Sequence, residues 1–203
     1  MKGLLLKDWF VLRQYSPMLV LVLAVYAALD WAGGGGMMAA LCMGLCAALP
    51  LSVLSANRPC RWDAFAQCLP VSRGMRVLET YAFTALLLAA SLLAGVALSV
   101  PSWMQGAPWS QHLRLYWQLF WAMVLFHALS LPLVYKLGVD KARYALLPVL
   151  LLIVVAAVTA GNAGFSFDGF VSGASLWILP LAGCALYAGS CALSREIYRR
   201  KEL

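Results

Sequence analysis

The sequence predicts an all-α, polytopic membrane protein with six transmembrane helices, built as a single transmembrane domain over residues 1–203. Two observations lead to this fold class. Of the 203 residues, 64% are hydrophobic and 11% are charged, whereas soluble domains are about 45–50% apolar and about 25% charged. The apolar residues also gather in runs of about 20, the length at which a helix crosses a bilayer. This composition excludes a soluble domain, a secreted disulfide scaffold, a disordered chain and, despite the net charge of +7, a nucleic-acid-binding domain.

The six apolar windows lie at roughly 17–32, 37–56, 77–99, 113–135, 144–161 and 174–194. Only three charged residues fall inside them: Asp30, Glu79 and Arg114. Each lies near a window end, from which a side chain can extend to water. We therefore expect no ionised group near the middle of the bilayer.

The basic residues predict the orientation of the chain. All of the 15 Lys and Arg residues except Arg114 lie before the first window, after the sixth, or in the segments that follow the second and fourth windows. Because Lys and Arg are retained on the cytoplasmic side of membrane proteins, this side is predicted to be cytoplasmic and to hold both termini. The expected location is a bacterial plasma membrane.

The N-terminal segment, 1–16, precedes the first window. Leu5, Trp9 and Leu12 fall on one face of a helix over these residues, and Lys7 lies opposite. This pattern predicts a short helix that lies in the membrane interface and leads into the first span. The alternative is a basic anchor that only sets the topology.

The longest cytoplasmic segment, 57–76, separates the second and third windows. It carries an apolar stripe at helical spacing, with an acidic residue that suits a helix N-terminus and a proline that stops a helix: Trp62, Asp63, Phe65, Leu69 and Pro70. Since so short a helix is not stable alone, it needs a surface to pack against, either the bilayer interface or another protein. A plain amphipathic loop is the alternative.

Small residues recur every four positions within two of the windows. They are Ala40, Gly44, Ala48, Ser52 and Ala56 in the second window and Ser91, Gly95 and Ser99 in the third. This spacing lets helix backbones approach closely, so these residues are predicted to lie at helix contacts, within the subunit or between subunits.

Three further features each allow two interpretations. His127, inside the fourth window, is a neutral packed residue or a proton relay. The outer segment 161–173, rich in Phe and Gly, dips into the outer interface or forms a flexible loop. The C-terminal tail from Ser194 is a solvated helix end or a contact for anionic lipid.

The sequence contains no catalytic or ligand-binding motif. GxxxxGK[ST], HExxH and GxSxG are absent, and neither the six cysteines nor the two histidines have the spacing of metal ligands. The residues outside the windows are divided among short segments, so they cannot form a soluble domain. We therefore expect no enzyme activity, cofactor or metal in this chain, and any energy-consuming step needs a separate protein.

Three segments together resemble the small six-span permeases of ABC-type-2 exporters: the N-terminal MKGLLLKDWFVLRQY, the loop RWDAFAQCLPVSRGMRVLETY and the basic C-terminal helix end. The resemblance implies that the loop forms a cytoplasmic coupling helix that docks on a separate ATP-binding subunit through Trp62, Asp63, Phe65, Leu69, Pro70, Ser72 and Arg73. It also implies a second permease copy or a homologous permease, with ATP and Mg in the partner subunit. The loop start NRPCR is basic where acidic residues are common in the family, and ETY replaces a more usual pair of a basic residue and Tyr.

These features favour a permease that moves amphipathic or hydrophobic cargo, such as a peptide, lipid or drug, because its interior is predicted to lack fixed charges. Its expected contacts are the ATP-binding subunit, another permease and membrane lipid, with no nucleic acid. Two other classes stay open. One is a non-transporting membrane scaffold or immunity protein that binds a partner in the bilayer, and the other is an integral membrane enzyme that acts on lipid.

Overall fold

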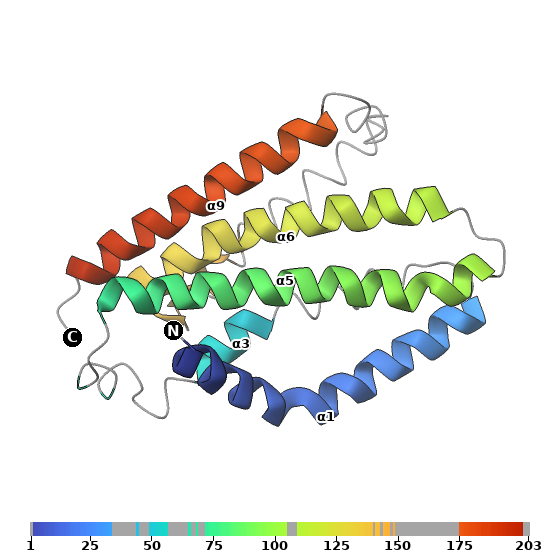
Figure 1. Ribbon diagram of the computed structural model, residues 1–203, viewed down its shortest axis with the longest axis horizontal. Coiled ribbons are helices and arrows are strands. Elements are labelled where there is room, and N and C mark those ends of the chain that lie inside the picture. The colour runs from blue at the N-terminus through green and yellow to red at the C-terminus, as the bar shows by residue number, and fades with distance from the viewer. Residues whose placement is uncertain are drawn as a thin grey trace. The chain divides into compact units, whose positions relative to one another are not determined.

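The computed structural model (Figure 1) describes residues 2–33, 44, 49–56, 65, 68, 72–104, 109–139, 141–142, 144–146, 148 and 175–200. The main elements are α1 (Lys2–Gly33), α3 (Leu49–Ala56), α5 (Arg73–Met104), α6 (Trp109–Leu137) and α9 (Ser175–Arg200). No strand occurs among these residues, which confirms the all-α class.

Two helices are long and apolar enough to cross a membrane, over Arg73–Val100 in α5 and Tyr116–Leu137 in α6. They contain the predicted third and fourth windows, 77–99 and 113–135. The chain is therefore an integral membrane protein. A third span is present if the two limbs of α1 act as one.

The count of six spans stays a prediction. Most of the second and fifth windows, 37–56 and 144–161, lies outside the described residues. The sixth window, 174–194, is covered by α9, which continues to Arg200.

A 61° bend divides α1 into the limbs Leu5–Gln14 and Ser16–Tyr26. Pro17 lies just after the bend and has no N–H to donate to the carbonyl of Arg13, four residues earlier. The hydroxyl of Ser16 donates to that carbonyl instead, at 2.7 Å. The bend thus has a local cause, and it falls next to the predicted boundary between segment 1–16 and the first window.

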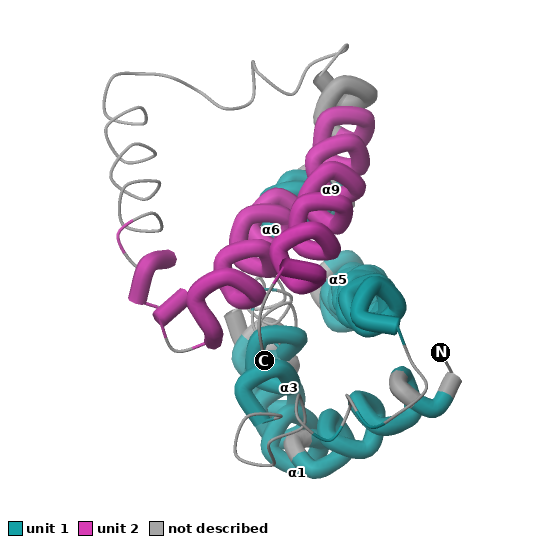
Figure 2. The backbone as a smooth tube through the Cα atoms, turned by 90° about the vertical axis from the view of Figure 1, so that its left-hand side faces the viewer, with its two compact units in different colours: residues 1–124, 201–203 teal, residues 125–200 magenta. Residues whose placement is uncertain are grey.

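The chain divides into two compact units, residues 1–124 with 201–203, and residues 125–200 (Figure 2). In the first unit, Val53 of α3 and Phe83 and Leu87 of α5 form a buried cluster, against which Leu5 and Leu12 of α1 pack. The first limb of α1 is therefore held against α5 by apolar contacts on the face that carries Leu5 and Leu12.

A second cluster in the same unit joins α5 to the first half of α6. Tyr116 is fully buried and contacts Leu92, Val96 and Leu98 of α5. Within a bilayer such contacts stabilise a helix pair by van der Waals packing, because lipid tails are as apolar as these side chains. These contacts hold α5 and the start of α6 together.

In the second unit, the rest of α6 packs against α9. The Ser190 hydroxyl donates to the carbonyl of Ala128 at 2.5 Å, and the rings of Tyr135 and Tyr198 lie 5.4 Å apart, edge to face. Gly138 then ends α6 with a φ of 82°, a backbone conformation that glycine adopts without strain.

Candidate functional site

The first turn of α5 fixes the end of the predicted coupling segment, 57–76. The N–H of Met75 donates to the Ser72 carbonyl at 3.1 Å and to its hydroxyl at 3.3 Å. Ser72 is therefore the N-cap of α5, since its side chain satisfies a backbone donor that has no partner within the helix. Ser72 and Arg73 are both exposed.

Within the segment itself the structure describes Phe65 and Cys68. The N–H of Cys68 donates to the Phe65 carbonyl at 3.0 Å, as in a helical turn. The Phe65 side chain is 58% exposed. The other residues predicted to dock a partner, Trp62, Asp63, Leu69 and Pro70, lie outside the described residues.

The face that α1 turns toward the protein differs in one residue from the predicted stripe. Leu5 and Leu12 are half-buried, but Trp9 is exposed, and Asp8 is only 3% exposed. Residues 5, 8 and 12 follow the i, i+3, i+7 spacing of a single helix face. Trp9 lies at the edge of this face and is 58% exposed, so it is available to a membrane interface.

A group of buried charges links the first limb of α1 to the start of α5. This α1–α5 charge cluster consists of Lys7, Asp8 and Glu79. Lys7 Nζ lies 2.6 Å from Asp8 Oδ1, and Glu79, only 5% exposed, lies within hydrogen-bonding reach of Asp8. The cluster thus contains two acidic groups and one basic group.

Glu79 was expected to extend to water at the membrane edge. The structure buries it among protein groups instead. The carboxyl groups of Glu79 and Asp8 therefore lie close together and away from water.

The buried face of α5 carries hydroxyl groups that bond within their own helix. Thr80 donates to the Arg76 carbonyl at 3.2 Å, and Thr84 donates to that of Thr80 at 2.8 Å. Ser91 and Ser99 donate to carbonyls three residues earlier, at 2.8 and 2.7 Å. Ser91 and Ser99 are thus buried on α5, and their hydroxyl donors are satisfied. Gly95, the predicted packing residue between them, is also buried.

The small residues of the second window are described only in part. A Cβ atom on Gly44 would lie 3.9 Å from Met123 Cε, an ordinary van der Waals contact, so this position accepts a small side chain. Ser52 is half-buried in α3. Ala40 and Ala48 lie outside the described residues.

Among the described residues no three His, Cys, Asp or Glu side chains come together to hold a metal ion. The arrangement combines an exposed aromatic residue in segment 57–76, a capped helix that starts at the end of this segment, and charged groups that link this helix to α1.

One protein family matches nearly the whole chain. No curated protein and no solved structure matches it. The family model described as ABC-2 family transporter protein matches residues 3–199, nearly the full length. This is the family that the N-terminal segment, the loop and the C-terminal helix end resemble. The chain belongs to the ABC-2 family of transporter proteins and is a membrane permease domain.

Proposed function

We propose that this chain is the transmembrane subunit of an ATP-driven exporter that moves amphipathic or hydrophobic cargo. Segment 57–76 docks on a separate ATP-binding subunit, which hydrolyses ATP with Mg. A second permease, identical or homologous, completes the pathway. Membership of the ABC-2 family supports the role of permease, and the finer steps are the proposal.

The exposure of Phe65 supports docking through this segment. A phenylalanine that is 58% exposed on the water side of a membrane protein leaves a large apolar surface uncovered. Aromatic anchors surrounded by polar groups are typical of the centres of protein interfaces. A partner that covers Phe65 removes this surface from water.

The start of α5 supports transmission of the motion. Ser72 caps the helix within seven residues of Phe65. From there α5 runs 32 residues without a break. A helix of this length is about 48 Å long, enough to carry a displacement from the cytoplasmic surface through the bilayer.

The test is capture of a co-expressed ATP-binding subunit by the purified permease. Phe65→Ala is expected to reduce capture about ten-fold or more, as truncation of a central aromatic anchor does. Phe10→Ala is the matched control, because Phe10 is 57% exposed but lies on α1. We expect that variant to retain capture.

Two outcomes contradict the proposal. One is a wild-type permease that captures no ATP-binding subunit, which favours a non-transporting scaffold. The other is equal capture by the Phe65 and Phe10 variants, which places docking elsewhere. Equal insertion of all variants into the membrane is checked first by extraction and gel filtration.

A further inference from the structure

The last four turns of α9 combine an apolar stripe with a basic end. Leu186 and Leu193 are exposed, and Arg200 follows them at the same seven-residue step. Residues seven apart lie on nearly the same side of an α-helix. The adjoining side is buried at Ser190, Ser194 and Tyr198. The leucines thus run in line toward Arg200 on the outward side of α9.

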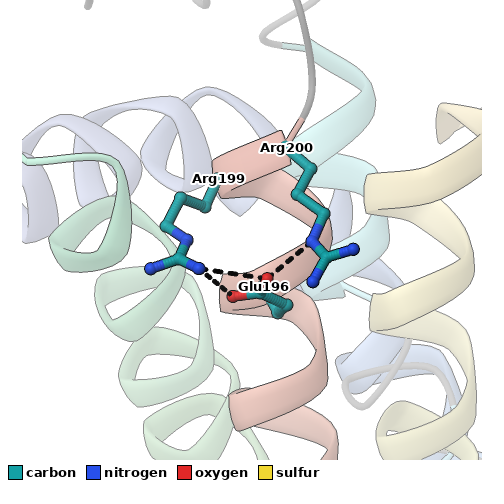
Figure 3. A network of polar contacts seen from close by, with 3 residues as sticks. All are labelled: Glu196, Arg199 and Arg200. Carbon is teal, nitrogen blue, oxygen red and sulfur yellow. Dashed lines mark hydrogen bonds and ion pairs between the residues drawn. The ribbon is translucent and has the colours of Figure 1, made fainter.

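Arg199 and Arg200 share one carboxylate at this end (Figure 3). Arg200 Nε lies 2.6 Å from Glu196 Oε1, and Arg199 Nη2 lies 3.1 Å from Glu196 Oε2. The hydrogen bond from Arg200 lowers the pKa of Glu196, so this carboxylate is ionised at neutral pH. Two cations on one anion leave a net charge of +1, and both arginine side chains remain 75–78% exposed.

The arginines are held in place yet keep donors for a ligand. A guanidinium group has five N–H donors, and the contact of Arg200 with Glu196 uses its Nε. Fixing the side chain beforehand reduces the entropy that a ligand must overcome on binding. Glu196 therefore orients the basic groups.

More positive charge surrounds this end of the second unit. The contact between Tyr135 and Tyr198 brings the ends of α6 and α9 together. Lys136, Lys141 and Arg195 are also exposed there. Among the described residues of 125–200, five are basic and Glu196 is the one acidic residue.

We propose that the end of α9 binds an anionic glycerophospholipid, with the phosphate on Arg199 and Arg200 and an acyl chain along Leu193 and Leu186. An apolar stripe that ends in arginines matches a lipid in both shape and charge. A soluble anion would use the arginines but not the leucines. The paired tyrosines suit the headgroup level of a bilayer, where aromatic residues concentrate. This site is independent of the proposed export function.

The experiment measures lipid binding by the purified permease with native mass spectrometry. Dioleoyl phosphatidylglycerol is the probe, and dioleoyl phosphatidylcholine is the headgroup control. Since one basic residue at a membrane surface contributes a factor of about five in affinity, Arg200→Gln is expected to weaken phosphatidylglycerol binding about five-fold. Arg13→Gln removes the same charge from an exposed position on α1 and is expected to have little effect.

Two further variants separate the parts of the site. Leu193→Ala is expected to weaken phosphatidylglycerol binding, whereas Leu181→Ala, exposed but off the stripe, is not.

The proposal is overturned if both lipids bind equally or if Arg200→Gln and Arg13→Gln behave alike. It is also overturned if Arg200→Gln leaves lipid binding unchanged but abolishes capture of an ATP-binding subunit, which assigns this surface to a protein partner.

Discussion

Asp8 and Glu79 are buried carboxyl groups on two different helices, and they meet in the α1–α5 charge cluster. A buried polar group that loses its hydrogen-bond partner stays desolvated without a compensating bond, and this lowers the stability of the folded protein. An amide in place of one carboxyl keeps a hydrogen bond to the other and removes one buried acid. The two kinds of substitution therefore separate the hydrogen bond from the charge.

We expect Asp8→Ala to lower the stability of the permease by about 1–3 kcal/mol, because it leaves the Glu79 carboxyl buried without this partner. Asp8→Asn is expected to change the stability much less. Thermal unfolding in detergent micelles measures both, with the exposed Gln14→Ala on the same limb as a control. Equal losses in the two Asp8 variants would show that the ion pair with Lys7, and not the hydrogen bond, carries the stability.

At the scale of elements, the bend in α1 separates an N-terminal limb held against α5 from a limb of different direction. Ser16 and Pro17 act together at the bend, since one supplies the donor that the other lacks. Proline inside a helix is the commonest cause of a sharp kink. The bend is thus a property of the local sequence.

Pro17→Ala is expected to straighten α1, because alanine restores the N–H that can bond to the Arg13 carbonyl. Spin labels at the exposed positions Leu6 and Val25 report the change by pulsed EPR. A straight helix places these backbone positions about 28 Å apart, and the bend shortens that distance. Ser16→Ala keeps the proline and is expected to keep the short distance. An unchanged distance in the Pro17 variant would assign the bend to packing.

The sequence predicted α5 and α6 well because their apolar runs are long and uninterrupted. It also predicted that a helix stops at Pro70, two residues before Ser72, which caps α5. It did not single out Asp8. Asp8 lies on the same helix face as Leu5 and Leu12, and this spacing was the available signal. Its burial depends on Glu79, 71 positions away along the chain, and helix periodicity carries no information about such a pairing.

For the whole molecule, the predicted topology places the positively charged segments and both termini in the cytoplasm. Cys68 offers a direct test, because it is exposed within segment 57–76. Cys184 is also exposed but lies within the predicted sixth window, among lipid-facing residues.

In a variant that retains Cys68 alone, we expect a membrane-impermeant maleimide to react in inverted vesicles and not in right-side-out vesicles. A variant that retains Cys184 alone is expected to react poorly in both, because the aqueous reagent does not enter the hydrocarbon. Reaction of Cys68 from the outside would reverse the orientation and move the proposed docking surface away from the ATP-containing compartment.

The hydroxyl groups along α5 have a consequence for motion. Thr80, Thr84, Ser91 and Ser99 each donate to a carbonyl of their own helix, so a shift of α5 past its neighbours breaks none of these bonds. Ser190 behaves differently, because it joins α9 to the backbone of α6. During transport by a permease, this arrangement lets α5 shift past its neighbours, whereas α6 and α9 move together as a single body.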